Sequence, residues 1–141
     1  MTIFDRARAN PDGLAVDDGD QQRTWAELVD RSTRVARFLR DDGGVAPDDH
    51  VAILMGNRTE YVEIVLGSIL AGVWLTPINW HLAPDEIAYI VEDSGAKLVF
   101  CDEAYEPVAP RPCCLWARPS SKRCLRRLPS PWTWPGLRAP P

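Results

Sequence analysis

Residues 51–100 constrain the fold more than any other part of the chain. Three short apolar runs, VAILM at 51–55, VWLTPI at 73–78 and KLVF at 97–100, alternate with two segments of helix length. Short continuous apolar runs joined by helical segments are typical of parallel strands that are buried on both faces and linked by right-handed crossovers. The sequence therefore predicts an α/β fold built on a parallel strand-helix-strand-helix-strand unit.

Both connecting segments carry helix signals at their ends. The first is predicted to begin at Asn57 and to end at Gly72, a residue suited to the left-handed conformation. The second is predicted to begin at Pro84, which fits the first helical position, and to end at Ser94–Gly95. The residues expected to face inwards are Tyr61, Ile64, Val65, Ser68 and Ile69 in the first helix and Ile87, Ile90 and Val91 in the second.

A short helix and a hairpin are predicted ahead of this unit. Residues 4–11 fit a helix that ends at Asn10, because a residue before proline is pushed away from the α region. Residues 14–25 consist of two short runs around an acidic tip that contains Gly19, which is typical of a hairpin.

A longer helix is predicted from Trp25 to about Arg40. Thr24 and Glu27 have the spacing of a capping box, which marks its start, and Gly43–Gly44 supplies its stop. Arginines recur along it at intervals of three, at Arg31, Arg34 and Arg37. An anion-binding stripe is one interpretation, but nearby acidic residues favour a solvated helix face.

Charge divides the chain near residue 106. Residues 1–106 hold all 20 acidic residues and 9 of the 16 basic ones, a net charge of -11, whereas residues 107–141 carry +7 and no acid. The second part also holds 9 of the 13 prolines and shows no helical or strand periodicity. The sequence therefore predicts one domain at 1–106 and an irregular Pro/Arg-rich tail at 107–141.

The composition of the tail supports two hypotheses. Such a density of Pro, Arg, Ala, Trp and Cys is typical of GC-rich coding DNA read out of frame, and sequencing the gene tests this because the in-frame continuation must then lie in another frame. Alternatively, the chain is a non-catalytic interaction module whose basic tail binds nucleic acid or an anionic membrane. Nucleic-acid binding would weaken steeply with added salt. The residues concerned are Arg126, Arg127, Trp116, Trp132 and Trp134.

Two groups of residues resemble metal ligands but have the wrong spacing. Asp48, Asp49 and His50 enter a strand one after another, so their side chains point in alternating directions and cannot converge on one ion. The cysteines of the tail lack paired CxxC spacing and a nearby histidine. They are Cys113, Cys114 and Cys124. The sequence therefore predicts no metal site.

Two further segments concern ligand binding near strand ends. Residues 93–97 (DSGAK) lack the second glycine and the four-residue gap of a Walker A loop, so we expect a helix end that passes into a strand. Asn79, Trp80 and His81 follow the second strand at its carboxyl end, where open α/β sheets usually bind ligands. A loop packed by Trp80 is the favoured interpretation, and a ligand-lining role is the alternative.

Three longer stretches carry a family resemblance. They are TWAELVDRSTRVARFLR at 24–40, PDDHVAILMGNRTEYVEIVLGSILAG at 47–72 and TPINWHLAPDEIAYIVEDSGAKLVF at 76–100. These residues resemble the N-terminal lobe of the AMP-forming (adenylate-forming) acyl-CoA synthetases of the fatty-acid-CoA ligase type. The resemblance covers roughly residues 1–106.

The resemblance implies a two-step reaction. A carboxylate attacks the α-phosphate of ATP to give an acyl-adenylate, and coenzyme A then displaces AMP to leave a thioester. Full-length members of the family would use ATP, Mg²⁺ and CoA, but their phosphate loop, ribose-binding aspartate and catalytic lysine lie downstream of the point where the resemblance stops. We therefore expect a truncated fragment, inactive alone, with no catalytic, cofactor-binding or metal residues and no cofactor of its own.

The sequence also predicts where the protein is located and whether it associates with itself. No apolar run reaches the roughly 20 residues that a bilayer demands, and the N-terminus has charges where a signal peptide needs apolar residues, which favours a cytoplasmic protein. A sheet cut off from its remaining strands leaves an open edge, so self-association through that edge is expected.

Overall fold

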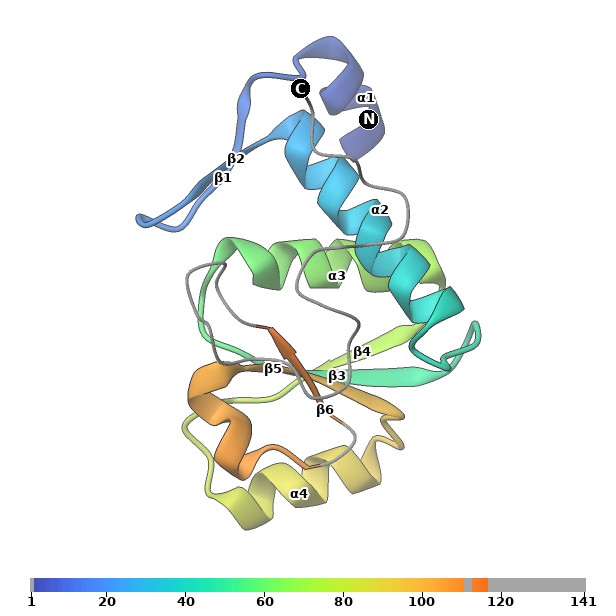
Figure 1. The fold of residues 1–141 in the computed structure, drawn as a ribbon, viewed down its shortest axis with the longest axis vertical. Helices are drawn as coiled ribbons and strands as arrows, with labels where there is room; N and C mark the ends of the chain where they lie inside the picture. The colour runs from blue at the N-terminus through green and yellow to red at the C-terminus, as the bar shows by residue number, and fades with distance from the viewer. Residues whose placement is uncertain (1, 111–112, 117–141) are drawn as a thin grey trace.

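A parallel sheet forms the centre of the structure. The computed structural model describes residues 2–110 and the backbone of residues 113–116. Four parallel strands lie in the order β4-β3-β5-β6 (Figure 1). They are β3 (His50–Leu54), β4 (Trp74–Pro77), β5 (Leu98–Asp102) and β6 (Cys113–Trp116). The α/β class and the predicted strand-helix-strand-helix-strand unit are confirmed.

Helices cover both faces of the sheet, and a hairpin stands apart from it. In Figure 1, α2 and α3 lie on one side of the strands and α4 lies on the other. The remaining elements are α1 (Ile3–Ala9), β1 (Leu14–Asp17), β2 (Gln22–Thr24), α2 (Trp25–Asp41), α3 (Thr59–Ala71), α4 (Pro84–Asp93) and the short 3-10 helix η1 (Glu103–Val108). None of the helices in the described part of the chain is long and apolar enough to cross a membrane.

Alternation along the strands creates two hydrophobic cores. Val51 and Ile53 of β3 point into the core beneath α2 and α3, whereas Ala52 and Leu54 pack with Ile87 on the side of α4. All four strand residues are 0% exposed. Burial on both faces explains why the strands are continuous apolar runs rather than alternating ones.

The local helix signals are confirmed where they were clearest. The amide of Glu27 donates to Oγ1 of Thr24, and the amide of Thr24 donates to Oε2 of Glu27 at 2.9 Å, which forms the predicted capping box. Gly72 ends α3 in the left-handed conformation with φ 75°. Pro84 is the first residue of α4.

The start of α3 differs from the prediction. The helix begins at Thr59, so its N-cap is Arg58 rather than Asn57. The side chain of Arg58 makes no capping hydrogen bond. The predicted helix start at Asn57 was wrong, because the first turn of α3 is stabilised by a residue from elsewhere in the chain, Asp18, which accepts from the amide of Thr59.

The buried side of α3 also differs from the prediction. Of the five residues expected to face inwards, Ile64 and Ser68 are buried and Tyr61 and Val65 are half-buried. Ile69 is 67% exposed, because it lies two residues beyond the contact of Gly67 with α2 and so on the opposite side of the helix. Glu60 and Glu63, which the apolar pattern left out, are buried instead.

Helices α2 and α3 approach one another closely at Gly67. A Cβ atom at this position would lie 2.5 Å from the Cβ atom of Val35 and 2.9 Å from the carbonyl oxygen of Ser32. Real Cβ atoms do not approach backbone and branched side chains so closely, so only glycine fits this crossing.

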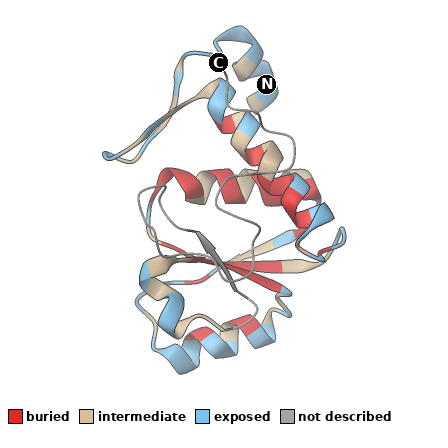
Figure 2. Ribbon diagram, in the orientation of Figure 1, coloured by how far each residue is buried: buried red, intermediate tan, exposed pale blue. Residues whose placement is uncertain are grey.

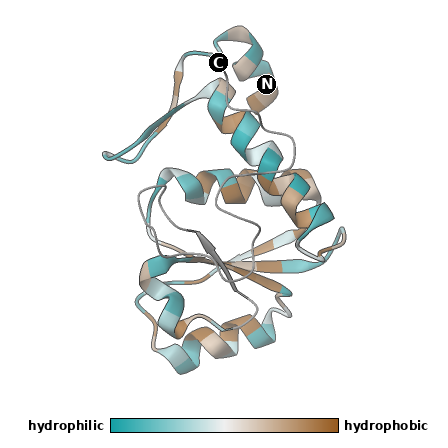
Figure 3. Ribbon diagram, viewed as in Figure 1, coloured by the Kyte–Doolittle hydropathy of each residue, from teal (hydrophilic) through white to brown (hydrophobic). Residues whose placement is uncertain are grey.

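The N-terminal residues lie outside both cores. No residue from 2 to 24 is buried, and Figure 2 shows α1 and the β1–β2 hairpin without buried positions. Figure 3 shows much of the central strands β3 and β5 as hydrophobic and the tip of the hairpin as hydrophilic. The hairpin was predicted correctly, with β1 and β2 paired antiparallel.

The two outer strands of the sheet differ in origin. Strand β6 lies within residues 107–141 and pairs parallel to β5. The sequence pattern predicted no strand there, because strands pair through backbone groups, which the periodicity of side chains does not report. The amide of Trp74 in β4 donates to the carbonyl oxygen of Asp49, just before β3, and the amide of Ile78, just after β4, donates to that of Ile53 in β3. Because successive residues alternate, Leu75 and Pro77 turn their backbone groups outwards, and proline has no N–H to donate.

Substitution of Gly67 by alanine should test the close helix crossing. We expect Gly67→Ala to lower the free energy of unfolding by about 1–3 kcal/mol, the usual cost of overpacking a core. Ile69→Ala on the same helix is the control, and we expect a change within about 0.5 kcal/mol because Ile69 is exposed. Urea denaturation followed by circular dichroism measures both, and equal effects would contradict the crossing.

Candidate functional site

The strand order places a topological switch point between β3 and β5. From β3 the chain passes through α3 on one face to β4, and then through α4 on the other face to β5. Open α/β sheets bind ligands outside the carboxyl ends of their strands at such a point. Residues 55–58 after β3 and residues 102–105 at the end of β5 therefore form the candidate site.

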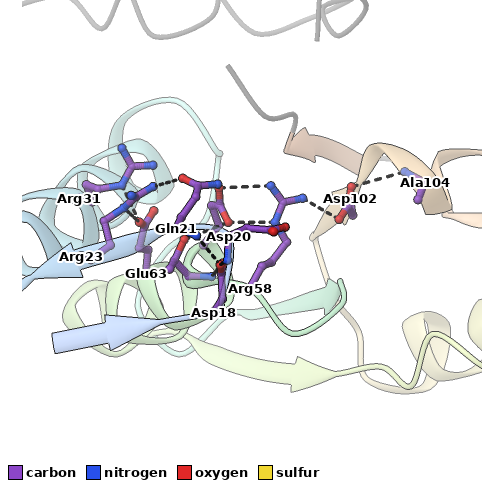
Figure 4. A network of polar contacts seen from close by, with 11 residues as sticks. Asp18, Asp20, Gln21, Arg23, Arg31, Arg58, Glu63, Asp102 and Ala104 are labelled. Atoms are coloured by element: carbon purple, nitrogen blue, oxygen red, sulfur yellow. Dashed lines mark hydrogen bonds and ion pairs between the residues drawn. The ribbon is translucent and has the colours of Figure 1, made fainter. Parts of the chain in front are cut away.

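The side chain of Arg58 occupies this position. It is 7% exposed, and its Nη1 atom lies 2.6 Å from Oδ2 of Asp102 at the end of β5. Its Nε atom donates to Oε2 of Glu60 at 2.9 Å, and its Nη2 atom donates to Oε1 of Glu60 at 3.2 Å. Two carboxylates thus bind one buried guanidinium group, which joins β5 to the first turn of α3 (Figure 4).

A second buried carboxylate lies one turn further along α3. Glu63 has a side chain that is 0% exposed, and its Oε1 atom accepts from Nε of Arg23 at 3.1 Å and from Nε of Arg31 at 2.5 Å. Arg31 was expected to belong to a solvated helix face, and this is wrong because the buried charge of Glu63 needs a cationic partner. Arg34 does pair within its own helix, with Asp30.

Residues of the hairpin connect the two carboxylates. Nε2 of Gln21 lies 3.4 Å from Oε1 of Glu60, and Oε1 of Gln21 accepts from Nη2 of Arg23 at 2.7 Å (Figure 4). Asp18 accepts from the amide of Thr59 at 2.8 Å. We call this set the charge cluster. It consists of Asp18, Gln21, Arg23, Arg31, Arg58, Glu60, Glu63 and Asp102.

The protonation of the cluster follows from its pairing. Burial acts to raise the pKa of Glu60, but the hydrogen bonds and charge of Arg58, together with hydrogen bonds from the backbone and from Thr59, outweigh it and bring that pKa below its usual value. Burial likewise acts to lower the pKa of Arg58, while Glu60 and Asp102 raise it overall. Both side chains are therefore charged at neutral pH.

The geometry of the charge cluster is suited to fixing the backbone rather than to transferring a group. Each guanidinium of Arg23, Arg31 and Arg58 already contacts a carboxylate of the same chain. The cluster was not predicted from the sequence, although the positions of two glutamates could have indicated it. Two glutamates three residues apart, Glu60 and Glu63, begin a helix that is otherwise apolar nearly all round.

Asn79, Trp80 and His81 lie at the same edge of the sheet. The ring of Trp80 stacks on that of Tyr105 with a centroid separation of 5.8 Å, and the ring of His81 lies 3.4 Å from that of Trp80. Oδ1 of Asn79 accepts from the amide of His81 at 3.0 Å. Trp80 is 41% exposed and packs the loop against η1, a contact that the sequence did not reveal.

The other sequence candidates are placed as follows. Nζ of Lys97 donates to Oδ2 of Asp49 at 2.7 Å, and the ring of His50 stacks on that of Trp74. Residues 93–97 carry the chain from α4 into β5, as expected. Across residues 2–110, no group of three His, Cys, Asp or Glu side chains could hold a metal ion.

The candidates in the tail lie largely outside the described residues. Only the backbone is described for Cys113, Cys114 and Trp116, which fall in β6. Cys124 and the pair Arg126–Arg127 lie outside the described residues, as do Trp132 and Trp134.

Known proteins are similar to this chain in sequence and in fold. The profile of the family described as AMP-binding enzyme matches residues 3–134. The chain belongs to the AMP-binding enzyme family. A medium/long-chain-fatty-acid–CoA/3-oxocholest-4-en-26-oate–CoA ligase of Mycobacterium tuberculosis is 40% identical over 97 residues, which cover 69% of this chain and 18% of the relative. This result confirms the resemblance found in the sequence.

Two further proteins are similar to this chain, one in sequence and one in sequence and fold. A fatty acid–[acyl-carrier-protein] ligase of Streptomyces coeruleorubidus is 38% identical over 85 residues, or 60% of this chain and 16% of that protein. The O-succinylbenzoate coenzyme A synthetase of Bacillus subtilis, solved with ATP and magnesium, has a TM-score of 0.71 at 31% identity and covers 82% of this chain and 32% of its own. The alignments thus span less than a fifth of the M. tuberculosis and S. coeruleorubidus ligases and about a third of the B. subtilis chain.

Acid should weaken the charge cluster. Because the pKa of Glu60 is lowered on folding, its contribution to stability is present above the pKa of an unfolded glutamate, about 4.3, and is lost as the pH falls through the lower folded pKa. We expect Glu60→Gln to melt at a lower temperature at pH 7 and to lose less stability than the unsubstituted protein below about pH 4.3.

Thermal melts followed by circular dichroism at a series of pH values measure this difference. The control is Glu92→Gln, an exposed position on α4, which should keep the pH dependence of the unsubstituted protein. Identical pH profiles for Glu60→Gln and Glu92→Gln would show that Glu60 contributes nothing to acid sensitivity.

Proposed function

We propose that this chain is the N-terminal part of an ATP-dependent ligase. The whole enzyme would activate a carboxylic acid as an acyl-adenylate and transfer the acyl group to the thiol of coenzyme A. The observation that carries the proposal is the family match over residues 3–134, on a sheet of order β4-β3-β5. The solved B. subtilis relative is named a coenzyme A synthetase and holds ATP and magnesium, which supports ATP, Mg²⁺ and CoA as ligands of the whole enzyme.

A fatty acid is the acid that we propose as substrate. The names of the M. tuberculosis and S. coeruleorubidus relatives both specify a fatty acid, and they differ in the acceptor, which is CoA in one and an acyl-carrier protein in the other. CoA is the acceptor of the relative with the higher identity over the longer alignment. A cytoplasmic location stays a prediction.

Within this enzyme, we assign the described residues the role of a scaffold. The buried charged residues near the switch point are engaged by partners of the same chain; they are Arg58, Glu60 and Glu63. The absence of catalytic and cofactor-binding residues therefore stays our expectation for this chain, as does its lack of activity alone. Self-association through an open sheet edge also stays a prediction, and the outward-facing Pro77 makes β4 a poor edge for it.

A chimera should test the proposed function. Residues 3–110 would replace the aligned segment of the M. tuberculosis ligase, and adenylation would be measured as fatty-acid-dependent exchange of pyrophosphate into ATP. We expect pyrophosphate exchange within about tenfold of that of the parent ligase. A tenfold loss corresponds to about 1.4 kcal/mol of lost transition-state stabilisation. The 141-residue chain by itself should give no exchange.

Two results would overturn the proposal. One is a chimera that melts cooperatively like the parent but gives no exchange. The other is formation of AMP by the 141-residue chain alone. A chimera carrying Tyr89→Ala, a change at an exposed position on α4, serves as the control for substitution itself and should match the unsubstituted chimera.

A further inference from the structure

The first turn of α3 is capped by a residue of the hairpin. Arg58 at the N-cap position makes no capping bond, and the amide of Thr59 donates to Oδ2 of Asp18 at 2.8 Å, from 41 residues away. A carboxylate at this place satisfies one of the orphan amides and interacts favourably with the helix dipole. Asp18 therefore does for α3 what a local cap residue does for other helices.

The same carboxylate also shapes the hairpin turn. Oδ1 of Asp18 accepts from the amide of Gln21 at 2.7 Å and from the amide of Asp20 at 3.0 Å. One side chain thus holds the turn with one oxygen and the helix with the other. The conformation of the turn and the capping of α3 are therefore coupled through a single group.

The hairpin meets α3 through polar groups. Besides Asp18, these are Gln21 on Glu60 and Arg23 on Glu63. No residue between 2 and 24 is buried, and none belongs to either hydrophobic core (Figure 2). Glu63 is buried, but the side chain of its partner Arg23 is 15% exposed, so added salt screens this ion pair in part, whereas apolar cores are not weakened in this way.

We propose that the β1–β2 hairpin is an ionic latch on α3. When it is docked, Asp18 caps the helix, Gln21 contacts Glu60, which also binds the Arg58 that pairs with Asp102, and Arg23 binds Glu63. When it is released, α3 loses its cap and the charge cluster opens to solvent at the carboxyl edge of the sheet. Glu63 keeps Arg31, so the sheet and its two cores stay folded.

Hydrogen exchange of the whole 141-residue chain tests the latch. We expect Asp18→Ala to speed exchange about fivefold in residues 14–24 and 59–62, which is the factor that loss of a helix cap brings, with no change in β3 and β5. The matched control is Asp17→Ala. Among the residues that the structure describes, Asp17 accepts only from Gly19 and Gln22 of the same hairpin, so the amides of residues 59–62 should exchange as before.

A second pair of variants leaves the bonds of Asp18 to the hairpin turn intact, although Arg23 also donates to Gln21 and to the carbonyl oxygen of Gln22. Arg23→Gln removes the hairpin's ion pair with Glu63, and we expect the same local acceleration in residues 14–24. Its control, Arg34→Gln, removes a pair that lies within α2 and should leave the hairpin unchanged. For the unsubstituted chain, raising the salt concentration from about 0.05 M to about 1 M should accelerate the hairpin and the start of α3 but not the sheet.

Two outcomes would overturn the proposal. If residues 14–24 accelerate only together with β3 and β5, the hairpin is part of the cooperative fold and does not open separately. If neither Asp18→Ala, nor Arg23→Gln, nor added salt changes exchange in residues 14–24, charges do not hold the hairpin on α3.

Discussion

Two carboxylates buried at the start of α3 determine how the N-terminal half of the protein is assembled. Glu60 and Glu63 are at most 2% exposed beside an apolar sheet, and an unpaired charge in such a place is strongly destabilising. Guanidinium groups must therefore reach them, and these come from β2, from α2 and from the N-cap of α3 itself. The docking of the hairpin and the path of α2 meet the same electrostatic requirement.

Features encoded by neighbouring residues could be predicted from the sequence, and features encoded by distant ones could not. The capping box of Thr24 and the left-handed end at Gly72 depend on a few adjacent residues, and both were predicted correctly. Apart from Arg58–Glu60, the ion pairs of the charge cluster join residues 32 to 44 positions apart, which no local pattern contains. Ile69 was misplaced for a related reason, because the side of α3 that turns inwards is decided by the fit of Gly67 against α2.

The location of the candidate site was easier to predict than its contents. The loop at Asn79 was placed at the carboxyl edge from the strand pattern alone, but the guanidinium of Arg58 that fills the switch point depends on Asp102, which follows it by 44 residues. Family membership, by contrast, rests on many ordered positions along the chain, so it can be recognised even where individual side-chain contacts cannot be predicted. Ancestry thus follows from the order of many residues, whereas the local chemistry depends on a few pairs of residues that are far apart in the same sequence.

Pro77 makes enlargement of the sheet one-sided. A new strand recruited beside β4 would find no donor at Pro77 and could form only an incomplete ladder there. Extension is therefore directed to the β6 side, whichever polypeptide provides the next strand. A single proline in one edge strand thus makes the two edges of the sheet unequal, which the parallel topology alone does not do.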